Sequence, residues 1–283
     1  MNIIEIKNVS YRYSIGTPYE KAALENVSVG FEKNKITGLI GHTGSGKSTL
    51  VQMLNGLIRP QSGKVVFDGT DIWDKPKQIS SIRFKVGLVM QYPEYQLFEE
   101  TVKKDIAFGL VNMGLTSEDE INEKVLKAAS IVGLSPETLE KSPFDLSGGQ
   151  KRRASIAGVI AMEPEVLVLD EPAAGLDPEG REAIFKVIDA YRKTNNATVI
   201  IVSHSMEDMA KWCDNIVVMS ESKLVMSGEC DEVFAHAEEL SKIGLNIPQI
   251  TRLLLILKKQ GVNINDKLYT IDDAEKAIAE LFK

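Results

Sequence analysis

Hydrophobic and polar positions follow two different periods along the chain, and the changes of period divide it into segments. Residues 3–9 and 24–31 mostly alternate apolar with polar or small side chains, which predicts a half-buried antiparallel pair of strands. Residues 36–40 are a short apolar run. The apolar residues after this run have the spacing of one helix face: Leu50, Val51, Met53, Leu54 and Leu57. The chain therefore begins as paired strands and continues as a strand that leads into a helix.

A helical period dominates residues 101–162, after two short predicted strands over residues 63–69 and 86–90. Apolar positions there recur every three or four residues, with charged residues between them: Ile121, Val125, Ala129 and Val132. Ser117 and Glu120 have the spacing of a capping box that would start this helix. We expect a helical block inserted into an α/β domain.

After residue 162 the pattern alternates strands with helices. Residues 166–169 and 198–202 are continuous apolar runs, typical of strands buried on both faces. The remaining predicted elements are helices over 179–193 and 205–212 and strands over 216–219 and 223–226. Such alternation predicts a parallel sheet covered on both faces.

The segment from about residue 236 changes character again. The apolar run over residues 253–257 is followed by Lys258 and Lys259, and residues 274–282 mix apolar with charged side chains, which predicts helices. We expect a small helical appendage after the α/β domain.

The composition is that of an ordinary soluble globular protein, since 43% of the 283 residues are hydrophobic and 26% are charged. A net charge of −7 argues against broad nucleic-acid binding, which needs a basic face. No run approaches the roughly 18 consecutive apolar residues of a membrane span, and the N-terminus carries charge where a signal peptide is apolar. The two cysteines, Cys213 and Cys230, give no disulfide framework, which favours a reducing cytoplasm.

A glycine-rich segment lies between the strand at 36–40 and the helix that follows it. Glycines let backbone N–H groups converge on a polyphosphate, and the helix start adds free donors. Lys47 would reach the terminal phosphates, and the Ser48 hydroxyl would ligate Mg²⁺. A chance match in a glycine turn should occur in only about one chain in a hundred of this length. The predicted nucleotide site includes the whole loop: Gly41, His42, Thr43, Gly44, Ser45, Gly46, Lys47, Ser48 and Thr49.

Two acids, Asp170 and Glu171, follow the buried strand at 166–169. The carboxyl ends of parallel strands form the edge at which α/β sheets bind ligands. One acid would hold Mg²⁺ opposite Ser48, and the other could accept a proton from the water that attacks the γ-phosphate. The alternative is an acidic pair that caps the turn at Pro172, but the upstream phosphate loop favours the catalytic interpretation.

Two further features extend this prediction. Residues 146–150 place an N-cap serine, Ser147, and two glycines at a second helix start that could bind an anion. A chain with one phosphate loop and one such remote element could complete its site with another copy or a partner; a flexible loop before a capped helix is the alternative. Tyr13 could stack on a purine ring or could simply cap the sheet.

Together these motifs resemble an ATP-binding-cassette ATPase. The resemblance covers residues 1 to about 235 and rests on the order and spacing of the phosphate loop, Gln91, residues 146–150, Asp170-Glu171, residues 174–177 and His204. It implies a P-loop ATP-binding-cassette α/β fold with an antiparallel β subdomain and an inserted helical subdomain. The implied domains are a cassette over 1–235, with the insertion at about 95–162, and a small C-terminal helical domain over 236–283.

The resemblance implies a head-to-tail dimer in which each ATP lies between one subunit's phosphate loop and the other subunit's signature. Ser147 and Gly149 match that signature. Asp177 resembles the residue that communicates across the dimer. The partner is implied to be a second ATP-binding subunit, either a similar chain or a copy of this one.

The same resemblance implies roles around the nucleotide. Tyr13 resembles the adenine-stacking aromatic, Gln91 the glutamine that contacts metal and water, and Glu171 the general base. His204 resembles the histidine that contacts the γ-phosphate. The implied ligands of Mg²⁺ are Ser48, Gln91 and Asp170.

A narrower resemblance is to the energy-coupling-factor branch, the cobalt and vitamin importers. It is carried by residues 91–98 (QYPEYQLF), 101–109 and 147–158 and by the helical tail. In that family two related ATPase subunits pair beneath a transmembrane coupling protein, which works with a substrate-binding membrane subunit. Residues 41–44 and 17–20 resemble the second ATPase of the pair. Ala173 stands where many relatives have threonine, which removes a hydroxyl but no catalytic group.

The sequence thus predicts a Mg-ATP-hydrolysing subunit, peripheral on the cytoplasmic face of the cell membrane, that powers uptake of a vitamin or other micronutrient. Dimer closure would pull on the membrane partner through a groove containing residues 92–98. The alternatives are a cobalt or nickel importer ATPase of the same branch, an exporter-type or amino-acid-importer cassette, a soluble cassette acting on nucleic acid or ribosomes, and a non-hydrolytic scaffold. The short stretch of residues 50–145 has no room for the long coiled coil of a chromosome-structure ATPase.

Overall fold

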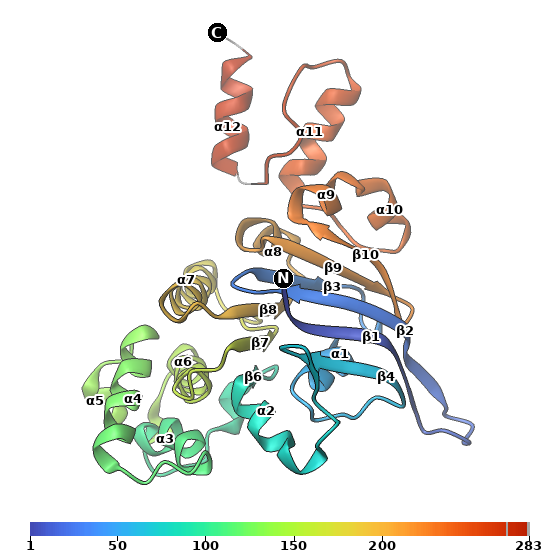
Figure 1. The fold of residues 1–283 in the computed structure, drawn as a ribbon. Helices are drawn as coiled ribbons and strands as arrows, with labels where there is room; N and C mark the ends of the chain where they lie inside the picture. The colour runs from blue at the N-terminus through green and yellow to red at the C-terminus, as the bar shows by residue number, and fades with distance from the viewer. Residues whose placement is uncertain (270, 282–283) are drawn as a thin grey trace.

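The computed structural model describes residues 1–269 and 271–281, and its strands form two sheets (Figure 1). The antiparallel sheet has the order β2 (Lys21–Glu32), β1 (Asn2–Tyr13), β4 (Ser62–Phe67) and β5 (Thr70–Asp71). The larger sheet has the order β10 (Lys223–Glu229), β9 (Asn215–Ser220), β3 (Ile36–Ile40), β8 (Thr198–Val202), β7 (Val166–Asp170) and β6 (Val86–Val89). In it β9, β3, β8, β7 and β6 are parallel and β10 is antiparallel. Both predicted sheets are confirmed.

Helices follow most of the strands. The first seven are α1 (Lys47–Leu54), α2 (Ile79–Lys85), α3 (Val102–Asn112), α4 (Glu118–Ile131), α5 (Pro136–Leu139), α6 (Gly148–Ile160) and α7 (Pro178–Asn195). The later ones are α8 (Met206–Trp212), α9 (Cys230–Ala235), α10 (Ala237–Lys242), α11 (Gln249–Lys259) and α12 (Ile271–Glu280). Three short 3-10 helices are η1 (Pro76–Gln78), η2 (Pro93–Gln96) and η3 (Pro143–Asp145).

Two hydrophobic cores lie on opposite faces of the parallel sheet. Along β7, Leu167 and Leu169 belong to the core that includes helices α3, α6 and α7, whereas Val166 and Val168 belong to the other core. That second core contains α1 and the antiparallel sheet. The parallel sheet is therefore covered on both faces as predicted, but on one face a second sheet supplies most of the cover.

Helix α1 ends before the last residue of the predicted apolar face. Leu50 and Leu54 are buried, but Gly56 has a φ of +69° and the N–H of Leu57 donates to the carbonyl of Gln52. Leu57 is 47% exposed. Its assignment to the helix was wrong, because this turn ends the helix and directs the chain away from the core.

The inserted helices pack on one another, with α3 and α4 both against α6. At the start of α4 the N–H of Glu120 donates to Ser117 Oγ, and within the described structure only this half of the predicted capping box is formed. The exposed side chain of Glu120 is left to the solvent. Ser147 and Gln150 form both halves of such a box at the start of α6.

The tail after α10 forms a small separate core around Leu254, Ile264 and Ala274. Both predicted helices are present as α11 and α12, although α12 begins three residues earlier than predicted and residue 282 lies outside the described residues. In the described parts of the chain no helix combines the length and the apolar character needed to cross a membrane.

Candidate nucleotide-binding site

The phosphate loop is held between the two sheets at two glycines. A Cβ on Gly41, where φ is +155°, would lie 2.3 Å from the carbonyl oxygen of Met219 in β9. A Cβ on Gly46, where φ is +103°, would lie 2.2 Å from the carbonyl oxygen of Ala23 in β2. Because backbone approaches this closely from both sides, only glycine fits at either position.

The side chain of Lys47 closes the loop on itself. Its Nζ donates to the carbonyl of Gly41 at 2.7 Å and to that of His42 at 3.0 Å. Burial lowers the pKa of Lys47, while the carboxylates of Glu171 and Asp170 raise it. The ammonium group is therefore fixed at the centre of the loop.

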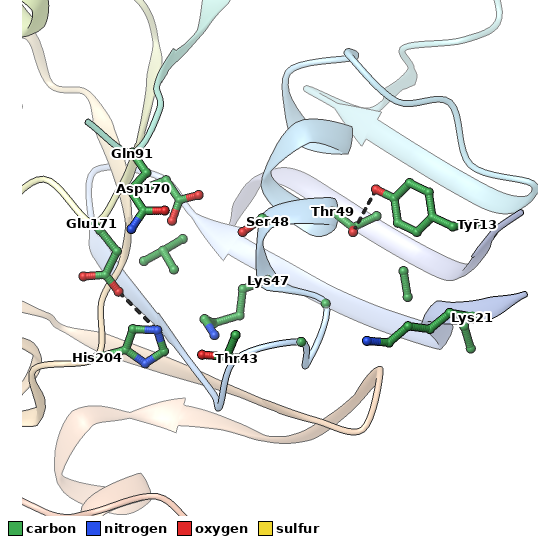
Figure 2. A pocket seen from close by; sticks show the side chains of 15 residues that line it. Tyr13, Lys21, Thr43, Lys47, Ser48, Thr49, Gln91, Asp170, Glu171 and His204 are labelled. Atoms are coloured by element: carbon green, nitrogen blue, oxygen red, sulfur yellow. Dashed lines mark hydrogen bonds and ion pairs between the residues drawn. The ribbon is translucent and has the colours of Figure 1, made fainter. Parts of the chain in front are cut away.

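One pocket collects side chains from distant parts of the sequence (Figure 2). They come from the end of β1, the start of β2, the phosphate loop and the ends of β6, β7 and β8. The predicted residues among them are Tyr13, Thr43, Gly44, Gly46, Lys47, Ser48, Thr49, Gln91, Asp170, Glu171 and His204. The ends of β6, β7 and β8 lie at one edge of the parallel sheet, as the sequence pattern predicted, whereas β1 and β2 belong to the antiparallel sheet.

The acidic pair lies at the carboxyl end of β7. Burial raises the pKa of Asp170, and a hydrogen bond from the Ser48 hydroxyl lowers it. Burial and the neighbouring Asp170 carboxylate raise the pKa of Glu171 to about 7, against the opposing effect of Lys47. Glu171 also has a φ of +52°. Its Oε1 is buried and makes no hydrogen bond among the described residues, while hydrogen bonds from the His204 backbone and the Ser203 side chain to the carboxyl group lower the pKa of Glu171.

His204 faces Glu171 from the end of β8. Its Nε2 lies 3.6 Å from Glu171 Oε1 (Figure 2). Burial, followed by the positive charge of Lys47, lowers the pKa of His204. The imidazole is therefore neutral near pH 7, and its side chain is 53% exposed to the pocket and solvent.

Tyr13 borders the opposite end of the pocket. Its hydroxyl and Thr49 Oγ1 share a hydrogen bond of 3.2 Å, which ties the ring to helix α1. Tyr11 packs edge-on against the ring at 4.9 Å. The Tyr13 side chain remains 41% exposed, so a ring face is accessible for stacking.

The other predicted loop residues do not line this pocket in the described structure. Gly41 lies against β9, as described above. The ring of His42 turns toward Ser220, whose Oγ lies 3.3 Å from Nε2, and its Nδ1 contacts the carbonyl of Thr43. Ser45 is buried beneath the loop.

The signature residues lie apart from the phosphate loop of the same chain. Ser147 and Gly149 are at the start of α6, and within the described residues neither they nor Asp177 line the nucleotide pocket. The Ser147 side chain is exposed. Asp177 caps α7 by accepting a hydrogen bond of 2.9 Å from the N–H of Gly180.

A buried arginine of α6 was not marked by the sequence. Arg152 is 3% exposed and forms a bidentate pair with Glu94 of η2, at 3.2 and 2.7 Å. Its Nη1 also donates to the carbonyls of Pro172 and Ala174, just after the acidic pair. One guanidinium thus joins the segment after Gln91 to the segment after Glu171. The sequence did not predict that Arg152 is buried, because Glu94 and the two carbonyls that bind it are far from Arg152 along the chain.

A phosphate loop and an acidic pair on one parallel sheet, with a helical block inserted between them, define the ATP-binding-cassette class of ATPases. The family model described as ABC transporter matches residues 24–174, which is more than half of the chain. Two solved structures are similar over most of this fold. The cbiO1 protein of Clostridium perfringens, part of an ABC transporter complex cbiONQ, has a TM-score of 0.76 and 39% identity over 89% of this chain and 98% of its own. The cassette MJ0796, solved as a dimer in a post-hydrolysis state with ADP and Pi, has a TM-score of 0.72 and 25% identity over 80% of this chain and 98% of its own.

Within this class, the chain belongs to the energy-coupling factor transporter ATP-binding proteins. It is 53% identical over 281 residues to the protein named EcfA2 from Clostridium perfringens, covering 99% of this chain and 98% of the relative. It is 50% identical over 280 residues to EcfA2 from Acetivibrio thermocellus, covering 99% of each.

Proposed function

We propose that this chain hydrolyses ATP as the second ATP-binding subunit of an energy-coupling-factor importer and thereby powers uptake of a vitamin or other micronutrient. The observation that carries the proposal is the single pocket in which Lys47 and Ser48 face the acidic pair at the end of β7. The full-length similarity to proteins named EcfA2 supports the transport assignment. A cobalt or nickel importer ATPase of the same branch is the alternative.

ATP would lie along the pocket with its base at Tyr13 and its terminal phosphates at Lys47. The exposed face of the Tyr13 ring suits stacking on adenine. The N–H groups at the start of α1 and the Lys47 ammonium would stabilise the charge that phosphoryl transfer spreads over the γ-oxygens. The whole loop, Gly41 to Thr49, shapes this cradle, with Gly41, His42 and Ser45 supporting it from outside the pocket.

The donors beside the phosphate site fit Mg²⁺. Ser48, Gln91 and Asp170 line one pocket and offer hydroxyl, amide and carboxylate oxygens, the hard ligands that Mg²⁺ prefers. The hydrogen bond between Ser48 and Asp170 already holds two of them together. A bound Mg²⁺ would neutralise charge on the phosphate oxygens.

Glu171 would act as the general base. The Glu171 carboxylate would accept a proton from the attacking water, and a pKa of about 7 suits this transfer at neutral pH. His204, neutral and 3.6 Å away, would contact the γ-phosphate and keep Glu171 oriented. Gln91 would contact both the metal and the attacking water.

The second half of each site would come from another subunit. Ser147 stands exposed and Gly149 half-buried at a capped helix start apart from their own phosphate loop, and such a start suits an anion. In a head-to-tail dimer the Ser147 hydroxyl and adjacent N–H groups would reach the partner's γ-phosphate, with Asp177 at the contact between subunits. The partner would be a similar cassette or a second copy.

The membrane partner would bind beside η2. Tyr92, Tyr95 and Phe98 are exposed there, and a groove beside Tyr95 reaches Phe144 and Lys151. Exposed aromatic side chains in this number are typical of a protein interface. With a membrane partner bound at these aromatic residues, the chain would lie peripherally on the cytoplasmic face of the cell membrane.

The proposed domains are a cassette over residues 1–235, with its helical insertion at about 95–162, and a C-terminal helical domain over 236–283. The separate small core of α11 and α12 supports a distinct C-terminal unit, while Leu240 and Leu245, which follow residue 236, pack in the core of the cassette.

Purification of the chain from native membranes tests this function. We expect a second cassette and a transmembrane protein to co-purify, and the purified assembly to hydrolyse Mg-ATP. Recovery with ribosomes or nucleic acid in place of membrane proteins, or an assembly without ATPase activity, would contradict the proposal.

A further inference from the structure

A lysine that no sequence motif marks lies in the nucleotide pocket. Lys21 is the first residue of β2 and pairs directly with Tyr13 of β1. Directly paired residues of antiparallel strands project to the same face of the sheet. Both side chains accordingly line the pocket, and in Figure 2 the Lys21 side chain extends from β2 toward the phosphate loop.

The start of β2 is fixed against the phosphate loop. Gly46 must be glycine because the carbonyl of Ala23, two residues after Lys21, approaches it so closely. The Nζ of Lys21 itself lies 3.6 Å from the position that a Cβ on Gly44 would take. The ammonium therefore lies close to the turn of the loop, where a side chain on residue 44 would touch it.

The carboxylates nearest to Lys21 in sequence are engaged elsewhere. Arg12 binds Glu20 at 3.1 Å and Glu25 at 3.2 Å, and Lys223 also contacts Glu25. Within residues 1–269 and 271–281, the structure contains no ion pair or hydrogen bond to Lys21 Nζ. An unpaired positive charge in a pocket attracts an anionic ligand.

We infer that Lys21 binds the nucleotide's phosphate chain next to the ribose, as a second side-chain cation beside Lys47. This inference rests on the proposed nucleotide site. A nucleotide with its base on Tyr13 and its terminal phosphates at Lys47 passes Lys21 where the ribose joins the first phosphate. Since ADP and ATP share that phosphate, Lys21 strengthens the binding of both, whereas the contact between Lys47 and the terminal phosphate distinguishes them.

Binding titrations of the full-length chain test this role. ADP, and ATP with EDTA to prevent turnover, are titrated into the wild type, Lys21→Gln, Lys21→Arg and the control Lys64→Gln. Lys64 is an exposed lysine on β4, outside the pocket. We expect Lys21→Gln to raise the Kd for ADP and for ATP by a similar factor of about five, and Lys21→Arg to stay within about twofold because it keeps the charge. Lys64→Gln should bind as the wild type does.

Adenosine, measured as a competitor of labelled ADP, separates phosphate from base. Its affinity should be the same in Lys21→Gln and in the wild type. An unchanged Kd for ADP in Lys21→Gln, or an equal loss for adenosine, would overturn the inference, with the thermal midpoint of each variant showing that it is folded. A wild-type chain that binds neither ADP nor ATP would instead overturn the proposed function.

Discussion

Replacing Glu171 by glutamine is expected to lower the rate of ATP hydrolysis by about 10²–10⁴-fold while ATP still binds. Glutamine has nearly the shape of glutamate, so the turn at φ +52° and the contact with His204 are kept. What is lost is the carboxylate that would take a proton from the attacking water. Single-turnover hydrolysis and equilibrium ATP binding, measured on the same preparation, check this result.

The pH dependence of ATP hydrolysis tests the same role of Glu171. In the free protein the pKa of Glu171 is raised to about 7 by burial and by Asp170. A base must be ionised, so kcat/KM, which reports the free enzyme, should be constant well above pH 7 and fall as pH drops below it. Glutamine does not titrate there, and the residual activity of Glu171→Gln should lose this dependence.

Glu165→Gln is the matched control, because Glu165 precedes the same strand, β7, at its other end and pairs with Lys85 on the surface. It should hydrolyse ATP at the wild-type rate. Turnover of Glu171→Gln that is close to normal would exclude Glu171 as the general base.

The second large effect is expected at Ser147. In the proposed head-to-tail dimer, an arginine there would place a long side chain where the partner's γ-phosphate would approach, and would remove the hydroxyl proposed to bind it. We expect Ser147→Arg to lower turnover of the assembled transporter by about 10²-fold or more. ATP binding to the isolated chain should not change, since Ser147 lies outside the chain's own pocket.

Ser117→Arg is the control for this substitution. Ser117 is likewise an exposed N-cap serine, at the start of α4, so both variants lose a cap worth about 1 kcal/mol. Only Ser147→Arg should lose activity. An equal loss in both variants would mean that the cap matters and not the contact with ATP.

The sequence predicted the parts of this site that depend on neighbouring residues. The strand, turn and helix around Lys47 follow from local glycine spacing, and Asp170 and Glu171 follow from a buried strand directly before them. The sheet edge then brings Gln91 and His204 to the same place, since all of them end parallel strands.

The sequence pattern could not predict contacts between segments that are far apart in the chain. Lys21 reads as the end of a loop until its register with Tyr13 is known. Arg152 reads as a surface charge in a basic stretch, yet it is buried because Glu94, 58 residues away, and two backbone carbonyls surround it. Leu57 has the right spacing for α1 but follows the turn at Gly56.

We propose that this chain carries halves of two different ATP sites and needs a partner to complete either. The most direct test is the ATP turnover of a fraction shown to be monomeric by sedimentation at the assay concentration, compared with the transporter isolated from native membranes. We expect the monomer to bind ATP but to turn it over about 10²-fold more slowly than the assembly. A monomer that hydrolyses ATP as fast as the assembly would contradict it.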